Sequence, residues 1–124
     1  KLSLIVYSPL SMGVLSGKYL QGTFPPNSRF TYKNYIQRTG TRYNPPHAQA
    51  AIEAYVNLAK KHGLDPAQMA LAFVNSREFV TSTIIGATSI EQLKTDIGSV
   101  AIKLSQEVLD EIEAIHTKYP NPIT

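Results

Sequence analysis

Two short segments of the chain are almost continuously apolar, and four other segments place apolar residues at helical intervals. The short segments are residues 2–7, Leu-Ser-Leu-Ile-Val-Tyr, and residues 79–85, Phe-Val-Thr-Ser-Thr-Ile-Ile. Both are rich in β-branched and aromatic residues, which predicts strands, and their low polarity predicts burial on both faces of a parallel sheet. Two strands make a poor sheet, so we expect most of the sheet to be missing from this chain.

The helical segments come with recognisable start signals. They cover residues 47–62, a segment that begins at Pro66, residues 90–100, and a segment that begins at Ser105. Asp65 suits the N-cap of the second helix. The third helix has two alternative capping boxes, Ser89 with Gln92 and Thr88 with Glu91. The second helix is apolar around much of its circumference, so we expect it to be largely buried.

A long segment of about residues 11–46 separates the first strand from the first helix. It is rich in glycine and proline and poor in apolar periodicity, and a loop of this length is usually functional or disordered. The order of elements is therefore strand, long loop, helix, helix, strand, helix, helix. Strands that alternate with helices predict an α/β fold with a parallel sheet.

The composition excludes several classes of site. The chain of 124 residues has the size of one small domain and contains no cysteine, which rules out disulfides, thiolate chemistry and cysteine-based zinc sites. Its histidines, His47, His62 and His116, lack the spacing of metal ligands, so we expect no metal site. Since no signal peptide and no apolar run long enough to span a bilayer is present, we expect a cytoplasmic protein that does not contact membranes.

Charge is distributed unevenly along the chain. Residues 1–52 contain six basic residues and no acidic one, a charge of +6, whereas residues 53–124 contain six basic and nine acidic residues, a charge of −3. An acid-free basic segment favours an anionic partner. The basic residues are spaced along the loop rather than clustered, so we expect a phosphorylated small molecule and no nucleic acid. A merely solvated basic loop is the alternative.

The carboxyl ends of the two strands are the expected ligand sites, because ligands of α/β folds bind there. One end is Tyr7-Ser8-Pro9-Leu10, and the other is Gly86-Ala87-Thr88-Ser89 at the start of a helix. Free N–H groups and the helix dipole make the second end suitable for an anion. By itself this second signal also fits an ordinary connection between a strand and a helix.

Taken together, several motifs resemble the aldo-keto reductases, with the best match to the branch that contains potassium-channel β-subunits and bacterial Tas-like oxidoreductases. Residues 7–19 resemble the seventh strand of the barrel and the loop after it. The other matching segments are Pro25, Pro26, Ser28 and Arg29 in the loop, 65–73 in the seventh helix, 84–93 in the eighth strand and helix, and 104–115 in the extra C-terminal helix. The resemblance covers essentially the whole chain.

The resemblance implies that residues 1–124 are the C-terminal part of a (β/α)8 TIM barrel, with about two βα units and an extra C-terminal helix. It also implies binding of NADPH in the complete protein, with weak or absent binding by the isolated chain. Tyr7 would stack on the nicotinamide ring, and Lys18 and Arg29 would contact phosphates, including the 2′-phosphate. The pyrophosphate path would be lined by Ser8, Pro9, Leu10, Ser11 and Met12.

The resemblance assigns the adenosine end of the cofactor to the second strand end. Gly86 and Thr88 match positions near the adenosine phosphate, and Gln92 matches a position that faces adenine. Two residues depart from the pattern: Asp96 stands where asparagine is usual, and Thr95 where glutamate is common. An aspartate carboxylate can accept a hydrogen bond from the adenine amino group but cannot donate one.

The resemblance implies carbonyl reduction by the complete protein, with a dinucleotide and a small carbonyl substrate as partners. The catalytic aspartate, tyrosine, lysine and histidine of the family belong to parts of the barrel that this chain does not match, so we assign no catalytic residue and expect no reductase activity from the chain alone. A non-catalytic nucleotide-binding or interaction module, or an inactive self-associating remnant, are the alternatives. The identity of the carbonyl substrate is left open.

Overall fold

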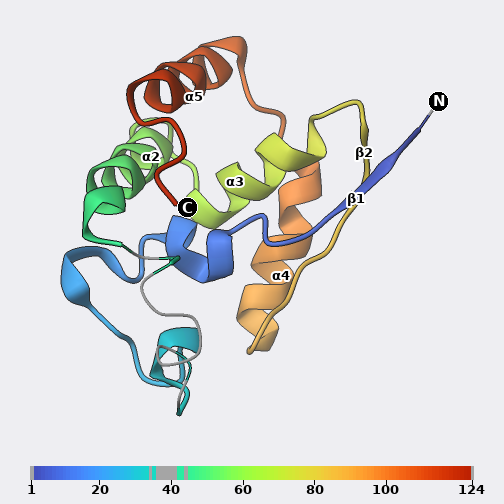
Figure 1. Ribbon diagram of the computed structural model, residues 1–124. Helices are drawn as coiled ribbons and strands as arrows, with labels where there is room; N and C mark the ends of the chain where they lie inside the picture. Colours follow the sequence, from blue (N-terminus) through green and yellow to red (C-terminus); the bar gives the residue numbers. More distant parts are fainter. Residues whose placement is uncertain (1, 34, 36–41, 44, 124) are drawn as a thin grey trace.

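A computed structural model describes residues 2–33, 35, 42–43 and 45–123 of the chain (Figure 1). The strands and α-helices are β1 (Leu4–Val6), α2 (Gln49–Lys61), α3 (Pro66–Asn75), β2 (Val80–Thr83), α4 (Ile90–Gly98) and α5 (Gln106–Lys118). Short 3-10 helices cover Ser11–Ser16, Leu20–Gly22, Arg29–Thr31, Pro46–Ala48 and Ser99–Ala101. The expected order of elements is confirmed. Residues 34, 36–41 and 44 of the expected loop lie outside the described residues.

The helices begin where their capping residues predict. The side chain of Asp65 accepts a hydrogen bond from the backbone N–H of Gln68 at 3.0 Å, and Ser105 accepts one from Val108 at 3.3 Å. For α4, Ser89 accepts from the N–H of Gln92 at 3.2 Å, so the first of the two alternative capping boxes supplies the N-cap. These contacts satisfy N–H groups that have no partner within the helix.

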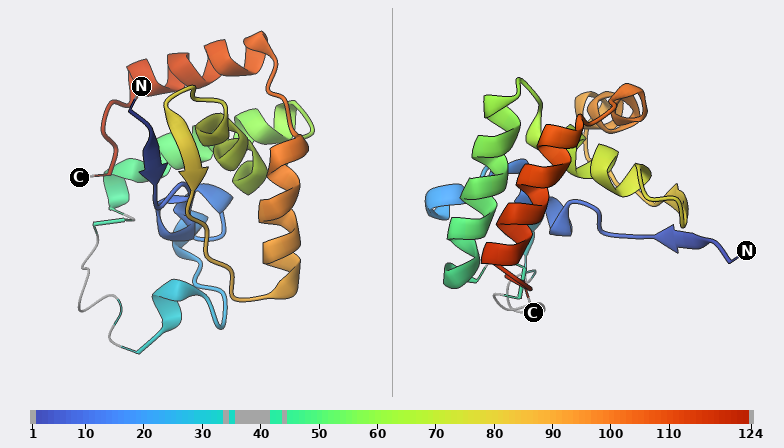
Figure 2. Two further views of the ribbon diagram at one scale, coloured as in Figure 1. Left: turned by 90° about the vertical axis from the view of Figure 1, so that its right-hand side faces the viewer. Right: turned by 90° about the horizontal axis from the view of Figure 1, so that it is seen from above.

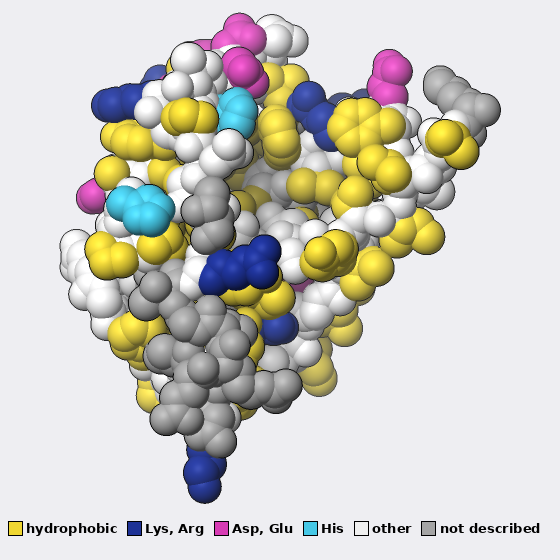
Figure 3. Space-filling view, in the orientation of Figure 1, with side chains coloured by type: hydrophobic (Ala, Val, Ile, Leu, Met, Phe, Trp, Pro, Cys, Tyr) yellow, Lys and Arg dark blue, Asp and Glu magenta, His cyan; other side chains and the backbone are white. Residues whose placement is uncertain are grey.

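The strands pair in parallel as expected, with Leu4 opposite Val80 and Ile5 opposite Ser82. The expectation that they are buried is wrong for this chain, because Leu4 is 51% exposed and Ile5 is 68% exposed. Each strand has one neighbour in the described residues, and Figure 2 shows the pair extending away from the helices. Hydrophobic side chains are therefore exposed along this projecting pair (Figure 3).

Two apolar clusters form the core, and α2 contributes to both. The first joins α2 to the loop and contains Val14, Tyr19, Phe30, Ala48, Ile52 and Val56. The second joins α2 to α3 and α5 and contains Leu58, Ala59, Met69, Val108 and Ile112. Met69, Leu71 and Ala72 of α3 are buried, which confirms the burial expected for that helix.

The segment expected to be an irregular loop contains an aromatic cluster that its sequence pattern did not indicate. The Tyr19 and Phe30 rings are both buried, with centroids 4.2 Å apart, and Phe24 lies beside both rings. Gly17 precedes Tyr19 with a φ of 81°, and a Cβ atom there would lie 2.9 Å from Cγ2 of Val56. Glycine therefore allows the loop to approach α2 closely.

Helix α4 and the 3-10 helix Ser99–Ala101 that follows it expose a stripe of apolar side chains. The exposed fractions are 73% for Ile90, 42% for Leu93, 56% for Ile97 and 75% for Val100. Spacings of three and four residues place these side chains on one face of the helix. This surface, which we call the α4 stripe, adds to the exposed apolar area of the strand pair.

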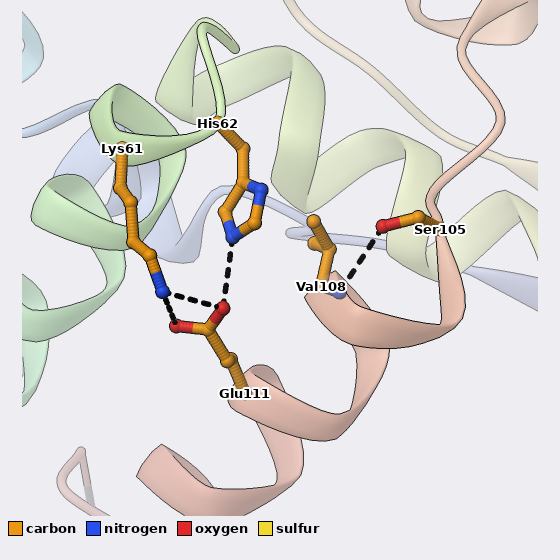
Figure 4. A network of polar contacts seen from close by, with 5 residues as sticks. All are labelled: Lys61, His62, Ser105, Val108 and Glu111. Atoms are coloured by element: carbon orange, nitrogen blue, oxygen red, sulfur yellow. Dashed lines mark hydrogen bonds and ion pairs between the residues drawn. The ribbon is translucent and has the colours of Figure 1, made fainter.

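A cluster of charged groups joins the end of α2 to α5 (Figure 4). Lys61 donates to both carboxylate oxygens of Glu111 at 2.9 Å, and Nε2 of His62 lies 2.8 Å from one of them. The hydrogen bonds from Lys61 and then from His62 lower the pKa of Glu111 below its ordinary value. This cluster lies beside the second apolar cluster, which packs the same two helices together.

We predict that Gly17→Ala destabilises the chain more than Gly22→Ala. Both glycines have a positive φ, which costs an alanine roughly 1–2 kcal/mol, but only at Gly17 would the new methyl group meet another side chain within 4 Å. The overlap with Val56 should add about 1–3 kcal/mol. Urea denaturation followed by circular dichroism measures both changes. Equal losses would show that the loop does not depend on its close contact with α2.

We also predict that Glu111→Gln lowers stability at neutral pH but not in acid. Because the folded pKa of Glu111 is depressed, its contribution is present above the unfolded pKa and is lost as pH falls through the folded value. The difference in unfolding free energy between the two chains should therefore disappear in acid. Glu113→Gln is the control, since Glu113 makes no salt bridge among the described residues. A difference that persists in acid would contradict the charge effect.

Candidate functional site

A cleft of about 570 Å³ lies where the two strands end. Its walls come from the end of β1 and the basic loop, from the end of β2, from the start of α3, and from α4. The volume is in the range of small-molecule sites. Parallel pairing accounts for this position, because it brings the carboxyl ends of β1 and β2 to the same edge.

The cleft brings together all of the expected ligand residues except Ser11. Those that line it are Tyr7, Ser8, Pro9, Leu10, Met12, Lys18, Arg29, Gly86, Thr88, Gln92 and Asp96. Ser11 instead lines a second groove of about 630 Å³, which also contains Leu15, Phe73 and Ile112. The expected placement of Ser11 with the other ligand residues is therefore not observed.

The backbone at the end of β1 is strained. Ser8, Ser11 and Met12 have φ values of 57°, 48° and 62°, a left-handed conformation that residues other than glycine rarely adopt. Each such residue costs on the order of 1–3 kcal/mol, and this strain is often found at ligand sites. Ser11, which lines the second groove, and Met12, which lines the cleft, are consecutive residues with this conformation.

Two cations from the loop reach the cleft. Nη1 of Arg29 lies 3.2 Å from the sulfur of Met12, and a Cβ atom at Gly86 would lie 4.0 Å from Nη2 of Arg29. Arg29 thus extends from the loop toward the end of β2. Nζ of Lys18 lies 5.2 Å from the centre of the Tyr19 ring. Among the described residues, neither cation makes a salt bridge, so both are available to an anion in the cleft.

The start of α4 uses its own side chains to cap the helix. The side-chain oxygen of Gln92 accepts hydrogen bonds from both the N–H and the hydroxyl of Thr88, each at 3.0 Å. Gln92 is therefore folded back over Thr88 rather than extended from the helix.

Tyr7 lies at the end of β1 and is 77% exposed, so its ring is open to the cleft.

Three acidic residues also line the cleft, and only Asp96 among them was expected there. Asp65 comes from the start of α3, and Glu91 and Asp96 come from α4. The sequence identified Asp65 only as a helix cap and did not indicate that it borders a cleft. Its position at the start of α3, the helix that contacts β2, is the feature that could have indicated this. Burial raises the pKa of Asp96, and the nearby charge of Asp65 raises it further.

The structure also contains a cluster of one histidine and two glutamates that the sequence did not indicate, because the histidines lie far apart along the chain. His62 lies near Glu107 and Glu111, with ligand-type atoms all within 4.8 Å of one another. Lys61 and His62 already hold Glu111, which favours a structural role in joining α2 to α5.

In the part of the chain that the structure describes, no helix combines the length and the hydropathy needed to span a membrane.

Comparison with known proteins identifies relatives over almost the whole chain. It is 50% identical over 119 residues to protein Tas of Escherichia coli, a match that covers 96% of this chain and 33% of Tas. It is 34% identical over 121 residues to a probable voltage-gated potassium channel subunit beta of rice, covering 96% of this chain and 37% of the relative. An aldo-keto reductase of Babesia bovis is 30% identical over 127 residues, a match covering 98% of this chain and 43% of the relative.

The chain thus spans about a third of the length of the first two relatives. The family model described as the aldo/keto reductase family matches residues 2–117. That match takes in both strands, the loop between β1 and α2, and nearly all of α5. The chain therefore belongs to the aldo/keto reductase family.

Proposed function

We propose that this chain forms the C-terminal part of the (β/α)8 barrel of an NADPH-dependent carbonyl reductase, and that its cleft holds the dinucleotide. The observation that carries the proposal is the meeting of Lys18, Arg29 and the exposed ring of Tyr7 in one cleft, at the strand ends. Family membership supports oxidoreductase chemistry. The chain order of two parallel strands with helices between and after them is consistent with part of such a barrel.

The residues of the cleft fit the chemistry of a dinucleotide. A phosphate needs cations and N–H donors, and Lys18, Arg29 and the start of α4 offer both. A flat nicotinamide ring fits the exposed face of Tyr7, which would stack on it and leave the opposite face to the substrate. We propose that Ser8, Pro9, Leu10 and Met12 line the pyrophosphate path between these two ends.

NADPH, when bound, supplies a hydride to a small carbonyl substrate. The role of this chain is to bind and orient the cofactor, and we assign no catalytic acid to it. A carbonyl that accepts a hydride also needs a proton, and a positioned acid contributes roughly 10²–10⁴-fold to such a step. We propose that the acid comes from a part of the barrel that lies outside these 124 residues.

The proposal is tested by the cofactor preference of Arg29→Ala in a complete barrel, made by replacing the aligned third of protein Tas with this chain. Arg29 should read the 2′-phosphate, which NADPH has and NADH lacks. One lost charge-assisted contact costs about 1.5–3 kcal/mol, so NADPH affinity should fall roughly tenfold to a hundredfold while NADH affinity changes little. Fluorescence titration measures both affinities.

The control is Arg42→Ala, which removes an arginine of the same segment. Arg42 lies over the Tyr43 ring, 5.5 Å from its centre, and does not line the cleft. NADPH affinity should be close to that of the parent barrel in this variant. Equal losses for NADPH and NADH in Arg29→Ala would show that Arg29 does not distinguish the two cofactors.

We further propose that the chain self-associates when it is produced as these 124 residues. The strand pair has exposed apolar side chains and open edges, and the α4 stripe exposes four more apolar residues. Apolar area gains about 25 cal/mol per Å² when it is removed from water, and open strand edges pair with other chains. Light scattering at micromolar concentration should report a mass above that of the monomer.

A variant of the α4 stripe sharpens this test. Leu93→Glu combined with Ile97→Glu should weaken association, whereas Lys94→Glu, on the same helix but outside the stripe, should leave it unchanged. A sharp thermal transition from a species with monomer mass would contradict self-association.

A further inference from the structure

The chain has two methionines and no cysteine, and the two methionine sulfurs have contrasting surroundings. Met69 is 3% exposed and belongs to the second apolar cluster, which joins α2, α3 and α5. Met12 is partly exposed and lines the cleft. Oxidation of sulfur in a protein follows its exposure to the solvent that carries the oxidant. Met12 is therefore the methionine that an oxidant reaches while the chain is folded.

The sulfur of Met12 contacts a cation that the cleft offers to an anion. Nη1 of Arg29 donates to this sulfur at 3.2 Å, and Nη2 of the same guanidinium faces Gly86 across the cleft. A thioether sulfur is a weak acceptor. Arg29 makes no salt bridge within the described ranges of the chain. A phosphate, which is a much stronger acceptor, can therefore take the guanidinium from the sulfur.

Buried neighbours hold these two side chains close to each other. Val14 follows Met12 by two residues and is 1% exposed, and Phe30 follows Arg29 directly and is 8% exposed. Both belong to the first apolar cluster, which packs the loop against α2. The sulfur and the guanidinium thus come from two anchored segments, so the contact between them follows from the packing of the loop.

Oxidation of Met12 replaces this weak acceptor with a strong one. A lone pair of the sulfur attacks one oxygen of hydrogen peroxide, the O–O bond breaks, and an S–O bond forms. The proton of the transferred hydroxyl group joins the departing hydroxide, so water leaves; the sulfur loses two electrons and the peroxide gains them. The product is a polar sulfoxide that methionine sulfoxide reductases can reduce again. Its oxygen, which carries partial negative charge, accepts a charge-assisted hydrogen bond from a guanidinium.

Resting on the proposed dinucleotide function, we propose that Met12 is an oxidation site for peroxides that controls whether Arg29 is free to bind the 2′-phosphate of NADPH. With Met12 reduced, the guanidinium leaves the thioether for the phosphate. With Met12 oxidised, the sulfoxide oxygen holds the guanidinium and fills space that a phosphate oxygen needs. Peroxide therefore lowers the affinity for NADPH more than the affinity for NADH, which has no 2′-phosphate.

The first measurement locates the oxidation. The full chain of 124 residues is treated with hydrogen peroxide, and peptide mass spectrometry follows the sulfoxide at each methionine. We expect Met12 to be oxidised well before Met69 in the folded chain, and both to be oxidised at similar rates in urea, where burial is lost. Oxidation of Met69 as fast as that of Met12 in the folded chain overturns the assignment of Met12 as the accessible site.

The second measurement is cofactor affinity in the complete barrel that carries this chain in place of the aligned third of Tas. Peroxide should lower NADPH affinity roughly tenfold, the smaller loss expected for one charge-assisted contact, and should change NADH affinity little. Methionine sulfoxide reductases should restore the original affinity. Met12→Leu has no sulfur to oxidise at this position, so its ratio of NADPH to NADH affinity should be the same before and after peroxide.

Arg29→Ala tests whether the effect of oxidation passes through Arg29. Peroxide should cause no further loss specific to NADPH in this variant, because two changes that act through one group do not add. A further loss as large as that of the unsubstituted barrel overturns the inference. Unchanged NADPH affinity after oxidation of Met12, or equal losses for NADPH and NADH, also overturns it and leaves the proposed function intact. If the untreated barrel does not bind NADPH, this inference and the proposed function fail together.

Discussion

Burial of Val14, Tyr19 and Phe30 against α2 holds the candidate site together. These side chains anchor a segment with little regular structure, and that segment carries the cations of the cleft. Lys18 lies directly before Tyr19, and Arg29 directly before Phe30, so each buried ring fixes the position of a neighbouring charge. A flexible loop would have to lose conformational entropy on binding an anion, whereas an anchored one has already lost much of it.

The elements of the fold were predictable because their signals are local. Caps such as Asp65 and Ser89 lie within one turn of the groups they satisfy, so the sequence alone located the helix starts. Burial of β1 was not predictable, because it depends on neighbouring strands that a single sequence segment does not describe. The aromatic anchors Tyr19 and Phe30 were missed for a related reason: an irregular loop has no period from which an inward-facing side chain can be recognised.

The sequence was sufficient to name most residues of the candidate site, but not to predict how they are arranged in space. The family resemblance indicated which residues should meet, and the parallel pairing of β1 with β2 brings nearly all of them to one edge. Ser11 lines the second groove instead, and its left-handed backbone, like that of Met12, had no signal in the sequence. Of the acidic residues that line the cleft, only Asp96 was expected. The role of Asp65 as a helix cap already explained its presence in the sequence, so it was not considered as a cleft residue.

The two paired strands, β1 and β2, are far apart in the sequence, because residues 7–79 lie between them. The helices between them contact each other and the loop, with α2 against α3 and both against Ser11–Ser16. Closing a long connection is slow because its entropy cost precedes any reward from the contact. The cleft between the strand ends therefore exists only while this long connection is closed, so its geometry depends on the pairing of the two strands.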